Sequence, residues 1–139
     1  MRRCLLLVGL AVGVLAAGCG KEEKEKEQAA KACPPAPTAL SGKPSLPAGF
    51  PTPSAVTYTS SKKLGPTQVA TGYYDGDIDS AFEGYKDALG SAAGFSVTRD
   101  EHEEVDAEVN FDGHGSSGQV KLLQRCRDRT SVTITARPE

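Results

Sequence analysis

Seven prolines lie between Pro34 and Pro53, with glycine and serine among them. Proline fixes φ and lacks a backbone N–H, so this density excludes helix interiors and central strands and favours extended chain. We interpret residues 19–52 as a disordered, solvated spacer, which at about 3.1 Å per residue would reach on the order of 100 Å. Its last part, LPAGFPTPS, is expected to lie along a folded domain because Phe50 is apolar.

A folded domain is expected over residues 53–139, where the pattern changes. AVTYTSSK and TQVATGYY are rich in Thr, Val and Tyr and flank Leu-Gly-Pro, which predicts a hairpin. The next stretch predicts a helix that Asp77 or Asp79 caps and Gly94 ends. Its apolar residues recur at helical spacing, namely Ile78, Phe82, Tyr85, Leu89 and Ala92.

Three or four strands should follow this helix. The segments FSVTR, VDAEVNF, GQVKLLQRC and SVTITA alternate between apolar and polar residues, which predicts strands with one dry face. The residues expected to face inward are Phe95, Val97, Val105, Ala107, Val109, Phe111, Val120, Leu122, Cys126, Val132, Ile134 and Ala136. The predicted fold class is therefore α+β, with a single helix packed on an antiparallel sheet of about five or six strands, ββαβββ(β).

The N-terminal residues have the pattern of an export signal. Arg2 and Arg3 precede an apolar run from Leu5 to Leu15, which is shorter than the roughly 20 residues a membrane-spanning helix needs. The following LAAGC resembles the lipobox of bacterial lipoprotein precursors. This resemblance implies a signal peptide over residues 1–18, cleavage between Gly18 and Cys19, and a diacylglyceryl group on the Cys19 thiol. An acyl chain such as palmitate on the new amino terminus is also implied.

Ala16 departs from that motif, because leucine is commoner at its position. Two alternatives remain open, an ordinary cleaved signal peptide with an incidental cysteine and an uncleaved anchor. A second resemblance, to small bacterial lipoproteins of unknown function, is carried by LPAGFPTPSAVTYT, DIDSAFEGYKDALGSAAGFSVT and RTSVTITARP. It supports the fold and implies no activity.

The net charge excludes one class of function, and the cysteine content predicts a disulfide. The formal charge is −2, and removing Arg2 and Arg3 leaves 14 basic against 18 acidic residues, or −4, which argues against nucleic-acid binding. Cleavage would discard Cys4 and lipid would occupy Cys19. In an oxidising compartment Cys33 and Cys126 would then form one disulfide; the alternative is two free thiols.

Three other groups of residues fit structural roles better than chemical ones. Asp75, Asp77 and Asp79 are spaced like the start of a calcium loop, but the later ligand positions are missing, so we expect them to charge the helix N-terminus. His102 and His114 are expected in solvated turns. Ser116 and Ser117 lack a nucleophile elbow. We therefore expect no catalytic residue, no metal and no cofactor other than the covalent lipid.

A basic group stands out in QVKLLQRCRDR, namely Lys121, Arg125, Arg127 and Arg129. These residues either pair with acids on neighbouring strands or form a basic edge that meets anionic wall polymer or lipid headgroups. The sequence predicts an exported lipoprotein, anchored on the extracytoplasmic side of a bacterial membrane, with a non-catalytic binding or structural domain. Its expected partners are the membrane and a cell-wall polymer or envelope protein. The alternatives are an envelope hydrolase or metal-dependent enzyme and a ligand sensor that acts through a membrane partner.

Overall fold

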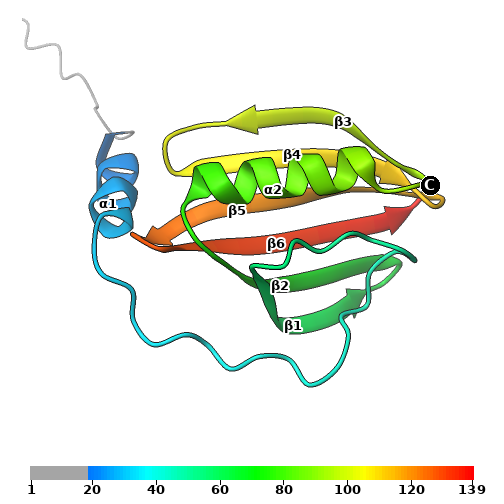
Figure 1. The fold of residues 1–139 in the computed structure, drawn as a ribbon, viewed down its shortest axis with the longest axis horizontal. Helices are drawn as coiled ribbons and strands as arrows, with labels where there is room; N and C mark the ends of the chain where they lie inside the picture. Colours follow the sequence, from blue (N-terminus) through cyan, green and yellow to red (C-terminus); the bar gives the residue numbers. More distant parts are fainter. Residues whose placement is uncertain (1–18) are drawn as a thin grey trace, which may run out of the picture.

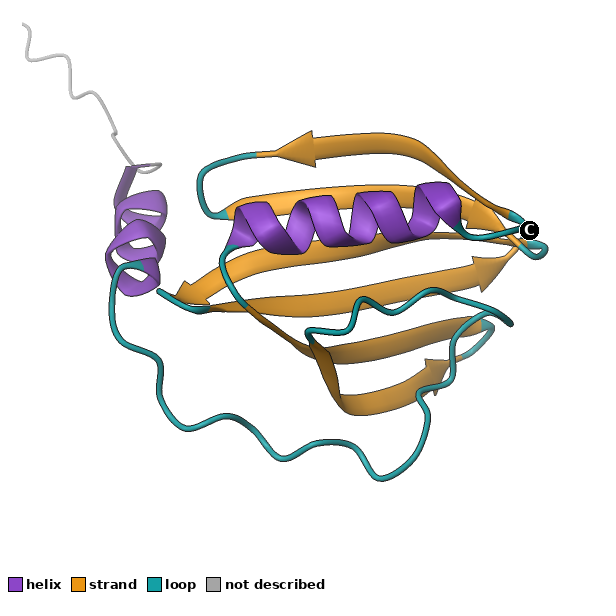
Figure 2. Ribbon diagram, in the orientation of Figure 1, coloured by secondary structure: helices purple, strands orange, loops and turns teal. Residues whose placement is uncertain are grey.

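A six-stranded antiparallel sheet with one helix across it forms the body of the protein (Figures 1 and 2). The computed structural model describes residues 19–139. Its elements are α1 (Cys19–Ala29), β1 (Val56–Leu64), β2 (Thr67–Asp75), α2 (Ile78–Ser91), β3 (Phe95–His102), β4 (Asp106–Gly113), β5 (Ser116–Cys126) and β6 (Arg129–Pro138). The predicted fold class is confirmed, with α1 as an additional short helix.

The strand order is β1-β2-β6-β5-β4-β3, and all neighbours are antiparallel. After β2 the chain crosses the sheet as α2 and enters β3 at the far edge. It then returns strand by strand until β6 fills the position beside β2. The β4–β5 hairpin turns at His114 and Gly115, whose φ angles of 50° and 70° suit a tight two-residue hairpin loop.

The core lies between α2 and the sheet. Asp77, one of the two cap residues that the sequence offered, caps the helix by accepting a hydrogen bond from Ser80 N at 2.8 Å. The predicted apolar stripe is buried from Ile78 to Leu89, and Ala92 forms the C-cap. Sheet residues buried opposite the helix are Ala70, Ala107, Val109, Phe111, Val120, Leu122, Val132, Ile134 and Ala136. The alternating pattern therefore places one face of the sheet against the helix.

Residues 30–55, here called the lead-in, differ from the expected solvated spacer. Leu40 N donates to Tyr58 O at 2.7 Å on the outer edge of β1, and Ser45 N donates to Ser61 Oγ at 2.7 Å. The Phe50 ring lies 5.2 Å from the Phe111 ring, between centroids, which confirms that this part packs on the domain. The lead-in runs along the β1 side of the sheet (Figure 1). Its backbone covers an edge that would otherwise be open to pairing.

The fully buried Tyr85 provides a test of the core. Its hydroxyl makes no hydrogen bond of good geometry among the described residues, although the Tyr58 hydroxyl, which is paired with Thr52 Oγ1 at 2.9 Å, lies nearby. Burial raises the pKa of Tyr85 well above 10, and the neighbouring Tyr58 adds to this shift. The folded protein therefore keeps the phenol protonated, whereas an unfolded tyrosine ionises near pH 10.

Tyr85→Phe should leave the free energy of unfolding at pH 7 unchanged or raise it by about 1 kcal/mol, because it removes an unpaired buried hydroxyl. In the wild type, the stability due to Tyr85 is complete below pH 10 and is lost as pH rises toward the raised pKa. The variant should lose less stability between pH 9 and 11, as measured by urea unfolding. Tyr73→Phe, outside this core, is the control. Equal alkaline losses in wild type and Tyr85→Phe would contradict the assignment.

Candidate functional site

A disulfide between Cys33 and Cys126 connects the lead-in to the end of β5, across 93 positions of sequence. The predicted pairing is confirmed. The two Cα atoms lie 5.0 Å apart, within the usual range for such a bond. Close by, Arg127 N donates to Lys31 O at 2.8 Å. The start of the lead-in is therefore held against the sheet by both a covalent bond and a backbone hydrogen bond.

The prediction that Cys126 faces inward with Leu122 is wrong. The register of β5 against β6 shifts between Gln124 and Cys126, so that Cys126 lies opposite Arg129 on the face away from α2. Strict alternation in the sequence does not reveal this bulge. Cys126 is nevertheless buried, at 2% exposure, because the lead-in covers it.

Gln124 occupies the inward position that precedes the bulge, and the sequence analysis did not single it out. Its Oε1 accepts a hydrogen bond from Ile78 N at 2.6 Å, and its Nε2 donates to Cys126 O at 2.7 Å. The buried Gln124 side chain thus provides hydrogen-bond partners for a backbone N–H at the start of α2 and for a backbone carbonyl at the bulged end of β5. A polar residue in an inward position of the alternating pattern was the only signal for it.

The lead-in and the outer face of the sheet enclose a cleft of about 290 Å³, here called the proline cleft. It lies on the opposite face of the sheet from α2, because Tyr73, Arg129 and Ser131 point away from the core. The residues that line it are Gln28, Pro34, Pro35, Pro37, Thr59, Gly72, Tyr73, Arg125, Cys126, Arg129 and Ser131. The disulfide therefore forms one end of a cleft that is otherwise lined by proline, tyrosine and arginine.

Arg129 is the most constrained cation in the proline cleft. Its Nη1 donates to Pro34 O at 2.8 Å, and its guanidinium carbon lies 5.2 Å from the centroid of the Tyr73 ring. Its Nε is buried and has no partner among the described residues. Arg125 is exposed, and no described residue forms a hydrogen bond or ion pair with its side chain. In the proline cleft, therefore, Arg129 bonds to the proline wall, whereas the Arg125 side chain has no hydrogen bond or ion pair with a described residue.

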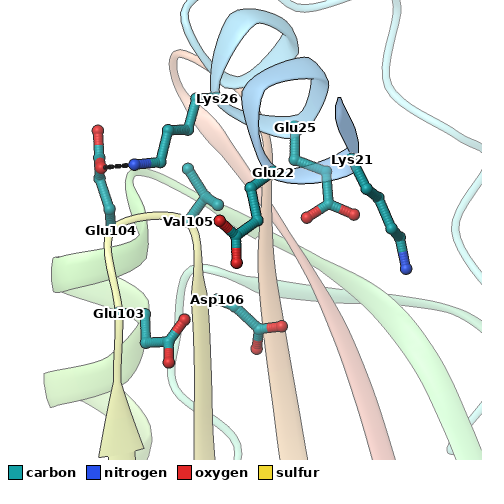
Figure 3. Close-up of a pocket in the computed structure, with 8 residues that line it drawn as sticks. All are labelled: Lys21, Glu22, Glu25, Lys26, Glu103, Glu104, Val105 and Asp106. Carbon is teal, nitrogen blue, oxygen red and sulfur yellow. Dashed lines mark ion pairs between the residues drawn. The ribbon is translucent and has the colours of Figure 1, made fainter. Parts of the chain in front are cut away.

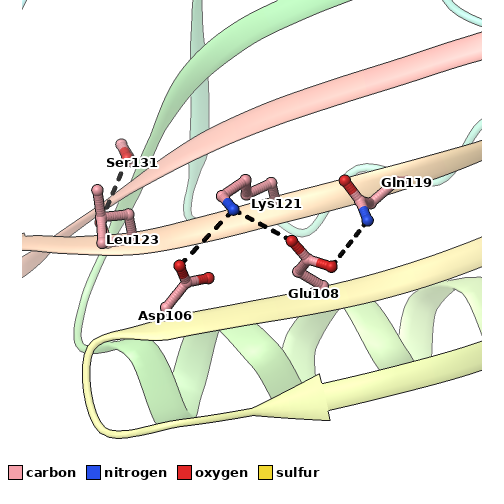
Figure 4. A network of polar contacts seen from close by, with 6 residues as sticks. All are labelled: Asp106, Glu108, Gln119, Lys121, Leu123 and Ser131. Atoms are coloured by element: carbon pink, nitrogen blue, oxygen red, sulfur yellow. Dashed lines mark hydrogen bonds and ion pairs between the residues drawn. The ribbon is translucent and has the colours of Figure 1, made fainter. Parts of the chain in front are cut away.

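The four predicted basic residues have different partners. Lys121 pairs across the strands with Glu108 at 3.1 Å and Asp106 at 3.6 Å (Figure 4). The hydrogen bond to Glu108 is the main cause of the raised pKa of Lys121. Arg127 Nη2 donates to Ala30 O at 3.5 Å. Of the two alternatives for this group, pairing with acids on a neighbouring strand applies to Lys121. The three arginines lie at or near the lead-in.

The aspartates and histidines form separate contacts. Asp77 caps α2, and the hydrogen bonds from Ser80 lower its pKa. Asp79 Oδ1 lies 3.0 Å from His102 Nε2, and the His102 ring stacks on Phe82 with 4.7 Å between centroids. His102 was expected in a turn, but it is the last residue of β3. No group of three or more potential metal ligands occurs among residues 19–139.

His114 lies at the β4–β5 hairpin tip, as predicted, but it is packed against its neighbours. Its Nε2 lies 3.2 Å from Ala93 O, and its ring centroid is 5.0 Å from that of Phe95. The adjacent Gly94 has φ 79°, and a side chain there would collide with the His114 ring. The contacts of His114 are therefore those of a structural residue in this turn.

A second groove lies between α1 and the β3–β4 turn, where Lys26 Nζ pairs with Glu104 at 2.5 Å (Figure 3). This pair raises the pKa of Lys26. On the same helix, Glu27 pairs with Lys31, four residues later, at 3.1 Å. The groove is lined mostly by acids and differs in charge from the proline cleft.

The predicted signal peptide, including Gly18, lies outside the described residues, and Cys19 is the first residue of α1. None of the helices in residues 19–139 has the length and hydrophobicity needed to cross a bilayer. Comparisons with protein-family models, curated proteins and solved structures gave no match. Any functional proposal for this chain therefore rests on its own residues.

Replacing both cysteines, as Cys33→Ser with Cys126→Ser, should lower the free energy of unfolding by up to about 4.7 kcal/mol, the chain-entropy value for a loop of this length. Urea unfolding of the non-reduced proteins measures this loss. Reductant should destabilise the wild type by a similar amount and leave the double variant unchanged. A loss below about 1 kcal/mol would show that the bond does not constrain the unfolded chain.

Proposed function

We propose that this protein is an exported bacterial lipoprotein, anchored through lipid on Cys19 and facing the extracytoplasmic side of the membrane, with a non-catalytic binding domain. The observation that carries the proposal is the Cys33–Cys126 disulfide, which lies a short distance after the lipobox-like LAAGC. Structural disulfides are typical of oxidising compartments outside the cytoplasm. The lipobox-like sequence and the disulfide thus both support a location outside the cytoplasm.

The structure changes the expected distance between anchor and domain. The 11 residues of α1 span about 16 Å at 1.5 Å per residue. Immediately after α1, Lys31 O accepts the hydrogen bond from Arg127 N, and Cys33 forms the disulfide. An anchor on Cys19 would therefore hold the domain close to the membrane, and the reach on the order of 100 Å does not apply.

The proline cleft supports a binding role for the domain. Pockets that bind small molecules are concave, largely apolar and supplied with a few polar groups, and this cleft has proline and tyrosine walls with two arginines. Its position on the face opposite α2 leaves the core intact. A cell-wall component or an envelope protein remains the expected source of a ligand.

The mass of the protein extracted from membranes tests the anchor. We expect a chain that starts at Cys19 and carries a diacylglyceryl group, with or without an added N-acyl chain. Cys19→Ser should abolish the added lipid and release the protein from the membrane fraction. Cys4→Ser is the matched control and should leave mass and location of the mature chain unchanged, because Cys4 would be removed with the signal peptide.

A mature chain that starts at Met1, or one that starts at Cys19 without lipid, would overturn the anchoring proposal. Circular dichroism and thiol counting on the same samples would report whether the domain is folded and bridged. These measurements separate a failure of anchoring from a failure of folding.

A further inference from the structure

We propose that the proline cleft binds a small organic acid, with a single aromatic or similarly flat apolar group between its walls and a carboxylate at Arg125. This inference rests on the proposed binding role and is independent of the lipid anchor. It commits to one chemical class of ligand because the walls, the charge and the size of the cleft each limit what can enter.

The walls favour an apolar, flat group. Pro34, Pro35 and Pro37 present ring carbons and have no backbone N–H to donate, and the Tyr73 side chain lies on the sheet side. Ser131 contributes a small polar side chain beside Tyr73. The Ser131 hydroxyl already donates a hydrogen bond to Leu123 O at 3.3 Å. The interior of the cleft therefore offers contact area for a ring and few free donors.

The charge favours an anion. Two arginines line the proline cleft, and the eleven lining residues include no Asp or Glu. Some cations elsewhere in the described chain pair with nearby acids, as in Lys86 with Asp100 at 2.7 Å and Lys121 with Glu108 at 3.1 Å, and others, such as Arg137, have no ion pair. Arg125 has no such partner, although the chain as a whole has more acids than bases.

The guanidinium geometry favours a carboxylate in particular. Arginine presents a planar fork of donors that matches the two oxygens of a carboxylate. Arg129 is committed to Pro34 O and to the Tyr73 ring, so it shapes the wall and adds positive potential. Arg125 is left to make the direct contact. The volume of about 290 Å³ lies at the lower limit for ligand pockets, which suits one ring.

Ligand binding in the proline cleft should depend on whether Cys33 and Cys126 are oxidised to the disulfide. Pro34 and Pro35 directly follow Cys33, so the bond to Cys126 fixes the wall at one end. Reduction would break the covalent link at that end and leave hydrogen bonds there, among them Arg129 Nη1 to Pro34 O and Arg127 N to Lys31 O. Binding should therefore weaken when the disulfide is removed, even where the sheet and its core persist.

The test uses the full chain, extracted from membranes in detergent with its disulfide intact, and three probes of the same shape. These are 3-phenylpropionate, its neutral amide and the cationic 3-phenylpropylamine. Changes in the chemical shifts of backbone amides, followed by NMR as a probe is added, report both the affinity of the probe and the location of its binding site. We expect saturable shifts at Tyr73 and Ser131 with the acid, and at least about tenfold weaker binding of the amide and the amine, since a hydrogen bond to a charged group contributes about 1.5–3 kcal/mol.

Two variants provide the comparison. Arg125→Gln should weaken binding of 3-phenylpropionate by about tenfold or more, whereas Arg137→Gln should leave it unchanged. Arg137 is also exposed and lies on the same face of the sheet, but it lines a different groove, beside Ser117 and Thr135. The double variant Cys33→Ser with Cys126→Ser should weaken binding as well.

Equal binding of acid and amide, or full binding by Arg125→Gln, would overturn the proposal. So would the absence of shifts at the proline cleft up to the solubility limit of the probe. A second arm uses an acetylated tripeptide that ends in phenylalanine: tighter binding than 3-phenylpropionate would identify a peptide carboxylate as the source, and weaker binding would favour a free acid. Failure with protein whose lipid has been verified by mass would refute this ligand class and leave the anchor unaffected.

Discussion

The bond between Cys33 and Cys126 determines how the N-terminal third of the described chain is arranged. It holds the lead-in against the outer face of the sheet, where Arg129 Nη1 bonds to Pro34 O. From there the chain passes the edge of β1 at Leu40 and reaches the helix side at Phe50. Both faces of the sheet and one of its edges therefore contact the same proline-rich segment, and the covalent link adds to the hydrogen bonds and the Phe50 packing that hold it there.

The bulge at the end of β5 makes that arrangement possible. Without the register shift between Gln124 and Cys126, the cysteine would point into the core below α2 and lie out of reach of the lead-in. Gln124 compensates for the disturbed ladder by bonding to Ile78 N and Cys126 O. A single irregularity in the sheet thus connects the start of the helix, the disulfide and the proline cleft.

The two grooves near the start of the lead-in differ in charge. Around α1 the lining residues are mainly acidic, and Lys26 is neutralised by Glu104. In the proline cleft the only charged side chains are Arg125 and Arg129. Surface ion pairs such as Lys26–Glu104 contribute little free energy. In the proline cleft, by contrast, Arg125 lies beside apolar walls and has no acid among the lining residues.

The sequence by itself determined the elements of the domain, because alternation, helical spacing and the Asp77 cap are local properties of the chain. It also predicted the disulfide between Cys33 and Cys126, which the structure contains. Only the tertiary structure decided that Cys126 faces outward, that the proline-rich segment packs on the sheet, and that Lys121 belongs with Glu108 while Arg125 and Arg129 share a cleft. Bulges, edge contacts and long-range pairing depend on residues distant in sequence, so no local pattern contains them.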